Sequence, residues 1–463
     1  MEIINNIEGQ MIKKKRITLS RNYRIFLFFI MINIESILNV SSGIFSSATK
    51  EIKFQLQLTD TKFGSFGTAN STGRVISSIL FGIINQKVSR KWTTIVFVSF
   101  HAVLLFFFKF TKNSHILIIF RGLLGFTQTT ASVYVPVWIN QFGLREYKTI
   151  QITSIQLFQT MGKLFGHFIN LILGPENWKN GFALEGMILL VLAFCCLISS
   201  ENYFDRTLYP EKIENKEEKI SCTIFEEQEV DKNEKNKNKG NYFSDLAELL
   251  KNPLYFFSLI SRCIIHGLNT CLHYWFSDFL RTVIKEKQVK VTICYSIICF
   301  AGPLGGIITN TILKPYIGNY ESRKSSWPIV ILQLIASIFA ICIGLMKETI
   351  SLCIITVIFL VFNSSALPLI QGILISCTDK KLSATGFAFA STCTQLATAG
   401  TTPMLYGLIN DKYKNIYPWL AMVSMMSLHL FAVPLLICLA ILRNKKFDEE
   451  EKIREKEEEL VDK

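Results

Sequence analysis

A stripe of polar and titratable side chains runs through one apolar segment in the second half of the chain. Its members are Arg262, His266, Asn269, Thr270, His273 and Ser277. They follow Arg262 at offsets of four, seven, eight, eleven and fifteen residues, which puts them on one face of a helix. The two histidines could bind a phosphate group or carry protons, because imidazole titrates closest to physiological pH. The alternative is that they are packing residues. No cysteine or carboxylate shares their spacing, so neither a metal nor a cofactor is expected.

Three further ionisable residues interrupt apolar segments: Glu35, Arg121 and Lys163. A charge inside a membrane span is costly and by default marks a substrate pathway or a buried partner. Arg121 could instead end its helix and snorkel to the membrane surface. Glu35 could be a protonated or paired packing residue, and Lys163 could either line a cavity or pair with Glu185.

The elements that carry these residues are expected to be membrane-spanning helices. Half of the 463 residues are hydrophobic, and charged residues make up 18%, against about a quarter in soluble proteins. A span needs about 20 mostly apolar residues. Twelve segments qualify: 23–45, 64–86, 93–111, 115–140, 150–173, 181–200, 253–280, 290–314, 326–347, 349–377, 383–409 and 417–442.

These segments predict an all-α membrane protein of twelve transmembrane helices in two six-helix bundles. The expected parts are a cytoplasmic tail (1–22), a first bundle (23–200), a cytoplasmic linker (201–252), a second bundle (253–442) and a charged cytoplasmic tail (443–463). The linker is rich in Lys, Glu and Asn and cannot bury apolar area. Lys and Arg gather in the even-numbered connections, which favours a cytoplasmic side for both termini and the linker. Arg281, Lys285 and Lys290 lie on the other side and weaken this bias.

The composition also excludes several classes of protein. The formal net charge of +13 has an ordinary cause in basic cytoplasmic loops, so no nucleic-acid partner is expected. Nearly all of the twelve cysteines lie in apolar runs and read as small hydrophobic residues. The first apolar segment follows a basic cluster and lacks a small-residue cleavage site, which indicates a spanning helix and not a signal peptide. No P-loop, HExxH motif or nucleophile elbow is present, so neither an enzyme nor an ATP-driven pump is expected.

The connection between the second and third segments resembles a signature of the major facilitator superfamily, Gly-x-x-x-Asp-Arg-x-Gly-Arg-Lys. Gly82, Lys87, Arg90 and Lys91 match it in type, whereas Gln86 stands where Asp is usual. In that family the loop latches the two bundles together on the cytoplasmic side, so these five are the expected gating residues. The alternative is an ordinary basic loop.

Two other segments resemble the spinster branch of that superfamily. One begins Arg121-Gly-Leu-Leu-Gly, and the other runs Pro403-Met-Leu-Tyr-Gly-Leu-Ile-Asn-Asp411. The resemblance implies a monomeric carrier in a lipid bilayer, working by alternating access with substrate bound between the bundles. It also implies a lysolipid substrate such as a lysophospholipid or a sphingoid phosphate, and coupling to protons. Other readings are a carrier of a different small-molecule organic anion or metabolite, and a non-transporting receptor or scaffold. The membrane that holds the protein is left open.

The sequence departs from the branch at its acidic positions. Gln128 replaces the usual glutamate of the fourth helix. In the first helix, alignment on Asn39 puts Ser42 at the acid's place, whereas alignment on Asn33 leaves Glu35 one place early and no arginine. Proton coupling is therefore expected to be absent or to use His266, His273, His167 or Lys163. The predicted substrate-binding residues are Glu35, Ser42, Arg121, Gln128, Lys163, Arg262, His266, Asn269, His273 and Gln395.

Overall fold

The structure is a computed structural model that describes residues 21–84, 89–144, 148–201, 204, 242–317, 322–378 and 383–461. Its helices are α2 (Arg21–Ile37), α3 (Val40–Ser47), α4 (Thr49–Leu56), α5 (Asp60–Ile84), α6 (Arg90–Phe110), α7 (Ser114–Phe142), α8 (Lys148–Leu173), α9 (Trp178–Ile198), α10 (Tyr242–Lys251), α11 (Pro253–Thr282), α12 (Gln288–Ile308), α13 (Lys314–Ile317), α14 (Ser326–Ile343), α15 (Thr349–Ser376), α16 (Ser383–Gln395), α17 (Thr402–Tyr413), α18 (Leu420–Ser427) and α19 (Ala432–Val461). The described residues contain no strand.

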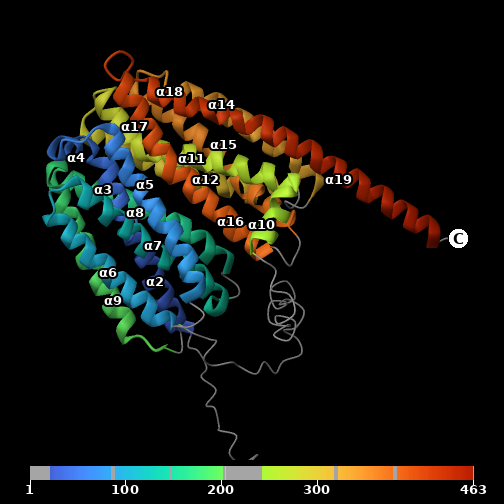
Figure 1. The fold of residues 1–463 in the computed structure, drawn as a ribbon, viewed down its shortest axis with the longest axis horizontal. Coiled ribbons are helices and arrows are strands. Elements are labelled where there is room, and N and C mark those ends of the chain that lie inside the picture. Colours follow the sequence, from blue (N-terminus) through green and yellow to red (C-terminus); the bar gives the residue numbers. More distant parts are fainter. Residues whose placement is uncertain are drawn as a thin grey trace, which may run out of the picture.

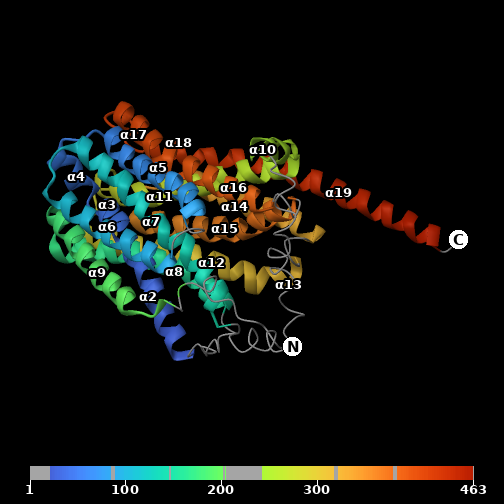
Figure 2. The ribbon, with the colours of Figure 1, turned by 60° about the horizontal axis from the view of Figure 1, so that its bottom comes forward.

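The helices pack as two groups, which lie side by side in Figures 1 and 2. We call α2–α9 the first half and α11–α19 the second half. Helix α5 lies against α17, and α8 lies against α12, across the contact between the halves. The ribbons of the two halves meet where α4 and α17 lie, the closed end, and separate toward α10 (Figure 1). The predicted domain boundaries and the sides of the membrane stay predictions.

Eight helical stretches of described residues are long and apolar enough to cross a membrane. The four other predicted spans correspond to α5, α8, α11 and the pair α16–α17, which carry more polar residues. These four are also helices through which the halves contact each other. Polar groups in a membrane are tolerated where they face protein or water instead of lipid. The lower hydropathy of these helices therefore follows from their place at the contact.

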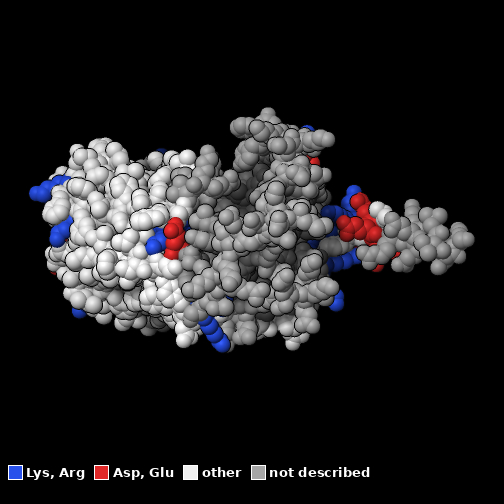
Figure 3. Space-filling view, turned by 90° about the horizontal axis from the view of Figure 1, so that it is seen from below, with Lys and Arg blue, Asp and Glu red and all other residues white. Residues whose placement is uncertain are grey.

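The outer surface is apolar, as a lipid-facing surface must be. Large hydrophobic side chains are exposed on helices of both halves, including Val191 (62%), Phe194 (61%), Ile338 (53%) and Ile354 (56%). Exposure of this extent marks a membrane or interaction surface. Figure 3 shows a face on which charged side chains are few over most of the described surface and gather along α19.

Four predicted spans are not continuous α-helices. The span 290–314 changes to a π-helix at Thr309–Leu313, and the span 383–409 does so at Leu396–Thr401. The other two are the first and the last. The first is interrupted between Ile37 and Val40, where the side chain of Asn39 donates a hydrogen bond to the carbonyl of Glu35 at 2.8 Å. The last is interrupted by a tight turn at Leu428–Phe431, after which α19 continues through the charged tail as far as Val461. Side-chain competition for backbone carbonyls is one cause of helix breaks, and it accounts for the break in the first span.

Glycine allows the first half to pack tightly around this interrupted helix. Gly162 of α8 lies against the carbonyl of Ser36, and Gly43 of α3 lies against the carbonyl of Lys163. A Cβ at either glycine would overlap the facing oxygen. These glycines therefore let α8 pack closely against the interrupted first helix.

Candidate functional site

Arg74, on α5, lies at the centre of the ionisable side chains near the contact. Its guanidinium interacts electrostatically with Glu35, Arg121, Lys163 and His266. Its buried Nε has no hydrogen-bond partner among the described residues. A buried N–H donor without a protein partner needs water or a ligand as its acceptor. Arg74 is therefore a candidate for contacting substrate, although the sequence analysis did not select it.

Glu35 is fully buried in α2, and only one of its two carboxylate oxygens is bonded. Oε1 accepts hydrogen bonds from Ser132 Oγ at 2.7 Å and from Gln159 Nε2 at 2.5 Å. Oε2 has no hydrogen-bond partner in the described parts of the chain. Arg74 is the cation whose charge acts on this carboxyl group. A proton or a ligand donor can therefore reach Oε2 without breaking the two existing bonds.

A second carboxylate–arginine group lies within the first half. Arg121 of α7 is only 4% exposed, so it lies inside the protein instead of reaching the membrane surface. Its Nη2 donates to Ser42 Oγ at 3.3 Å, and its guanidinium carbon lies 4.5 Å from the centre of the Phe45 ring. Glu185 of α9 interacts electrostatically with Arg121, and its Oε1 is 3.9 Å from His101 Nε2. Among the described cations, Arg121 is therefore the one whose charge acts on Glu185.

Lys163 and three histidines meet where α8 faces the second half. Lys163 acts electrostatically on His266 and His273 of α11. The His167 ring stacks on the Tyr295 ring of α12 with centroids 3.7 Å apart, and the His273 ring meets the same tyrosine edge-on at 6.0 Å. Nδ1 of His266, Nδ1 of His273 and both ring nitrogens of His167 lack hydrogen-bond partners among the residues described. This part of the predicted polar face of α11 therefore faces the first half.

The remaining predicted binding residues have different surroundings. Arg262 acts electrostatically on His266, and its buried Nη1 has no partner in the described chain, as is also true of Asn269 Oδ1. Gln128 is buried and donates from Nε2 to Asn39 Oδ1 at 3.0 Å. Gln395 is the half-buried last residue of α16, and none of the contacts described above involves it.

The predicted gating residues are described only in part. They are Gly82 within α5, Gln86 and Lys87 outside the described residues, and Arg90 and Lys91 at the start of α6. Lys91 is buried, and its Nζ donates to the carbonyl oxygens of Leu197 at 2.9 Å and Ser199 at 2.5 Å. A lysine at the carboxyl end of a helix, here α9, is favourable for its exposed carbonyls. This contact lies within the first half, and the latch between halves stays a prediction.

A charge network joins the halves at the closed end. Lys53 of α4 binds two carboxylates: its Nζ lies 2.7 Å from Asp60 Oδ1 of α5 and 2.9 Å from Asp278 Oδ2 of α11. Burial lowers the pKa of Lys53, but the charges of Asp278 and Asp60 outweigh it, so the net shift is upward. A raised lysine pKa means that this stabilisation is present at neutral pH and is lost only as pH rises through the raised value.

The same network caps a helix across the contact. The carboxylate of Asp411, on α17, accepts hydrogen bonds from the backbone N–H groups of Asp60 and Thr61 at 2.8 Å each. These are free donors at the amino end of α5, where a carboxylate is favourable. Lys414 adds an ion pair to Asp60 Oδ2 at 2.9 Å. We call Lys53, Asp60, Asp278, Asp411 and Lys414 the closed-end lock.

The sequence analysis missed Arg74 and the closed-end lock for different reasons. Arg74 lies inside the predicted span 64–86, so the rule applied to Arg121 would have selected it. The charges of the lock lie in loops or near helix ends, where an acid or lysine is unremarkable. Nothing local marks Lys53 as the partner of Asp278, which is 225 residues away.

Solved structures of membrane transporters share this fold. A bacterial homolog of the human lysosomal transporter Spinster, inward-facing and unoccupied, has a TM-score of 0.69 and 14% identity, covering 93% of this chain and 99% of its own. The nucleoside transporter NupG has a TM-score of 0.61 and 12% identity, covering 91% and 99%. The D-xylose–proton symporter has a TM-score of 0.64 and 14% identity, covering 89% and 97%. No curated protein matches the sequence significantly.

A family model gives the decisive comparison. The model described as Major Facilitator Superfamily matches residues 26–402, which is most of the chain. The predicted twelve-helix fold class and the predicted multi-pass membrane protein are thereby confirmed, and the match indicates a transporter instead of an enzyme. The chain belongs to the Major Facilitator Superfamily.

Proposed function

We propose that this transporter carries an amphipathic anion, such as a lysophospholipid or a sphingoid phosphate, through the space between its halves. The observation that carries the proposal is the balance of charge near the contact. Among the described residues, the cations Arg74, Arg121, Lys163 and Arg262 form one electrostatically coupled group with two carboxyl groups, Glu35 and Glu185. If both carboxylates are ionised, an anionic head group would still meet an excess of positive charge.

Unpaired donors support the same proposal. Arg74 Nε and Arg262 Nη1 are buried without protein acceptors in the described chain. Charge-assisted hydrogen bonds from such donors are stronger than neutral ones, and a phosphate offers several acceptor oxygens. The choice of a lipid rather than another organic anion comes from the spinster-like segments at Arg121 and Pro403.

The arrangement of the halves supports alternating access. The closed-end lock ties them at one end, whereas their ribbons separate toward the other (Figure 1). In transporters built from two such bundles, access alternates as the bundles rock around a central site. With the linker side as the cytoplasm, this structure would be an inward-facing state.

The test is uptake by vesicles that contain the purified protein. A lysophospholipid with a phosphate head group should enter at least about tenfold faster than a monoacylglycerol with the same chain, because hydrogen bonds to charged groups contribute about 1.5–3 kcal/mol. Protein-free vesicles are the control for passive entry. Equal rates for the two lipids would refute an anion carrier, and uptake of neither would favour a receptor or a carrier of another solute.

Arg121→Ala is expected to abolish this uptake while the protein still inserts in the membrane. The change removes the charge that acts on Glu185 and the donor to Ser42. Arg121→Lys should recover little, because a point charge does not reproduce the planar fork of donors. Initial rates in vesicles, normalised to inserted protein, give the measurement. Normal uptake by Arg121→Lys would reduce the residue to a local positive charge.

A further inference from the structure

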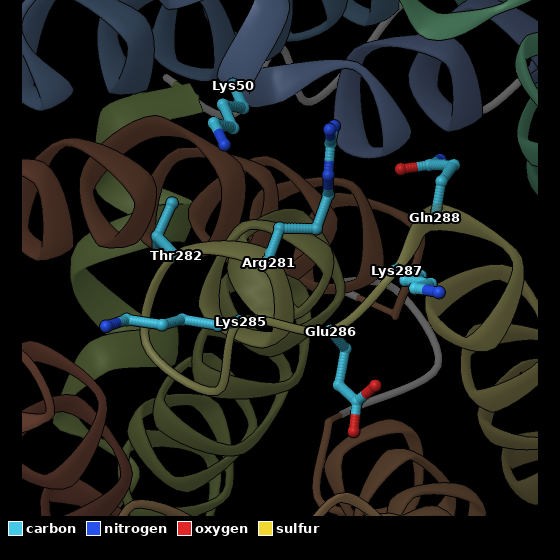
Figure 4. Close-up of a pocket in the computed structure, with 7 residues that line it drawn as sticks. All are labelled: Lys50, Arg281, Thr282, Lys285, Glu286, Lys287 and Gln288. Carbon is cyan, nitrogen blue, oxygen red and sulfur yellow. The ribbon is translucent and has the colours of Figure 1, made fainter.

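A basic pocket at the closed end has no role in the proposed transport path. It has a volume of about 670 Å³ and is lined by Lys50 of the first half and by six residues between Arg281 and Gln288 of the second half. Figure 4 shows Lys50 extending toward the end of α11 that carries Arg281, with Lys285 and Lys287 pointing to opposite sides of the segment that follows. Both halves thus contribute cations to one depression.

Three lysines at the pocket have no carboxylate to pair with among the described residues. Positions 50, 51 and 281–290 hold five cations and two carboxylates, a formal charge of +3. Arg281 forms a two-pronged ion pair with Glu51, and Glu286 binds Lys290. Lys50, Lys285 and Lys287 are exposed and have no ionic partner among the described residues. The pocket therefore has uncompensated positive charge.

The backbone at the pocket adds to this charge. Lys285 has a φ of 66°, a left-handed conformation that favours glycine and costs another residue roughly 1–2 kcal/mol. No side chain caps the amino end of α12 at Lys287 and Gln288, where helical N–H groups carry partial positive charge. The Glu286 carboxylate points away from Lys50 in Figure 4 and toward Thr349 and Lys290. A lysine held in a strained backbone conformation, next to the uncapped amino end of a helix, could bind an anion together with the helical N–H groups.

The place of these lysines in the chain is unusual as well. Lys and Arg normally gather in cytoplasmic connections, and this loop is predicted to lie on the opposite side. The preference of Lys and Arg for the cytoplasmic side therefore does not explain a basic cluster in this loop. Because Lys50 and Lys285 belong to different halves, an anion between them would hold the halves together as the closed-end lock does.

We propose that the pocket between Lys50, Lys285 and Lys287 binds a phosphate group, and that the bound group stabilises the state closed at this end. The phosphate belongs either to a soluble compound or to a lipid head group in the surrounding leaflet. The proposal does not depend on what the central site carries.

Thermal unfolding of the full-length protein in phosphatidylcholine nanodiscs tests the binding. The probes are pyrophosphate in solution and phosphatidic acid in the bilayer, at matched ionic strength. A probe at a hundred times its dissociation constant should raise the unfolding temperature by roughly 3 °C. The triple variant Lys50→Ala, Lys285→Ala, Lys287→Ala should lose the shift. The matched control is Lys62→Ala, Lys112→Ala, Lys347→Ala, which removes three exposed lysines from the same end and should keep it.

Lys285→Gly is a second variant that removes a lysine without destabilising the fold, because glycine adopts the φ of 66° without strain. It therefore separates loss of binding from loss of folding. This variant should unfold no earlier than the wild type and yet bind the probe less tightly. A shift with pyrophosphate alone identifies a soluble ligand, and a shift with phosphatidic acid alone identifies a lipid. No shift with either probe, or an equal shift in the triple variant, would overturn the binding site.

The effect on the halves is measured separately. Ser46, 3% exposed, donates a hydrogen bond to the carbonyl of His273 across the contact at 3.1 Å. Ser46→Cys in a cysteine-free background reports opening of the closed end through its reaction with a membrane-impermeant thiol reagent. The bound probe should slow this labelling at least about threefold, and only when the three lysines are present. Unchanged labelling despite a thermal shift would overturn the bridging role.

Discussion

Arg74→Ala is expected to reduce transport at least about a hundredfold, a loss comparable to that expected for Arg121→Ala. Arg74 is the cation whose charge acts on the buried Glu35, and it interacts electrostatically with Lys163 of the first half and His266 of the second. Truncating one member of a buried charge pair costs about 2–5 kcal/mol, partly because the other charge remains unpaired. Initial uptake rates in vesicles, normalised to inserted protein, measure the effect.

Two further variants separate charge from geometry in this result. Arg74→Lys should recover part of the rate, because it restores the charge but not the fork of donors. Lys109→Ala is the control. It removes a cation of α6 that lies over the neighbouring Phe110 ring, so this variant should transport normally. Arg74→Ala with an unchanged rate would remove Arg74 from the proposed substrate path.

Lys53→Ala is expected to open the closed end, the largest conformational effect of any single change. Lys53 is the only residue of the closed-end lock that contacts Asp60 and Asp278 together in the described chain. Removing one partner of a buried ion pair costs about 3–5 kcal/mol, and about 5.5 kcal/mol reverses a 99:1 equilibrium. Labelling of Ser46→Cys from the closed end should therefore quicken at least about tenfold.

Lys414→Ala is the matched control. Lys414 binds the same Asp60 at 2.9 Å, but its side chain is 45% exposed, against 16% for Lys53. Exposed ion pairs contribute only about 0–1 kcal/mol, so labelling should change little. If the two variants label at the same rate, burial of Lys53 is not what holds the end closed.

The class of protein could be predicted because hydropathy is a local and additive property. Long apolar segments need lipid or a protein core wherever they lie, so their lengths predict spans without knowledge of packing. The polar stripe of α11 was predictable for a related reason, since helical periodicity alone places Arg262, His266 and His273 on one face. Arg74 was within reach of the same local reasoning.

Other features depend on groups that meet only in the folded protein. The interruption of the first helix involves Asn39, whose side chain lies between a carbonyl of α2 and Gln128 of α7. The sequence offered Lys163 as a partner of Glu185, whereas in the folded protein the charge that acts on Glu185 is that of Arg121 of α7. Which side chains interact depends on distances of a few ångströms, and helical periodicity does not specify such distances.

The sequence by itself determined a membrane-embedded helical transporter and most of the charged groups within its spans. Only the tertiary structure decided which charges compensate one another and which remain unpaired. Lys53 and Asp278 are separated by 225 positions, yet folding brings them into a largely buried ion pair. The physical reason is that an ion pair depends on distance and dielectric, and both are set by the packing of helices remote in the chain.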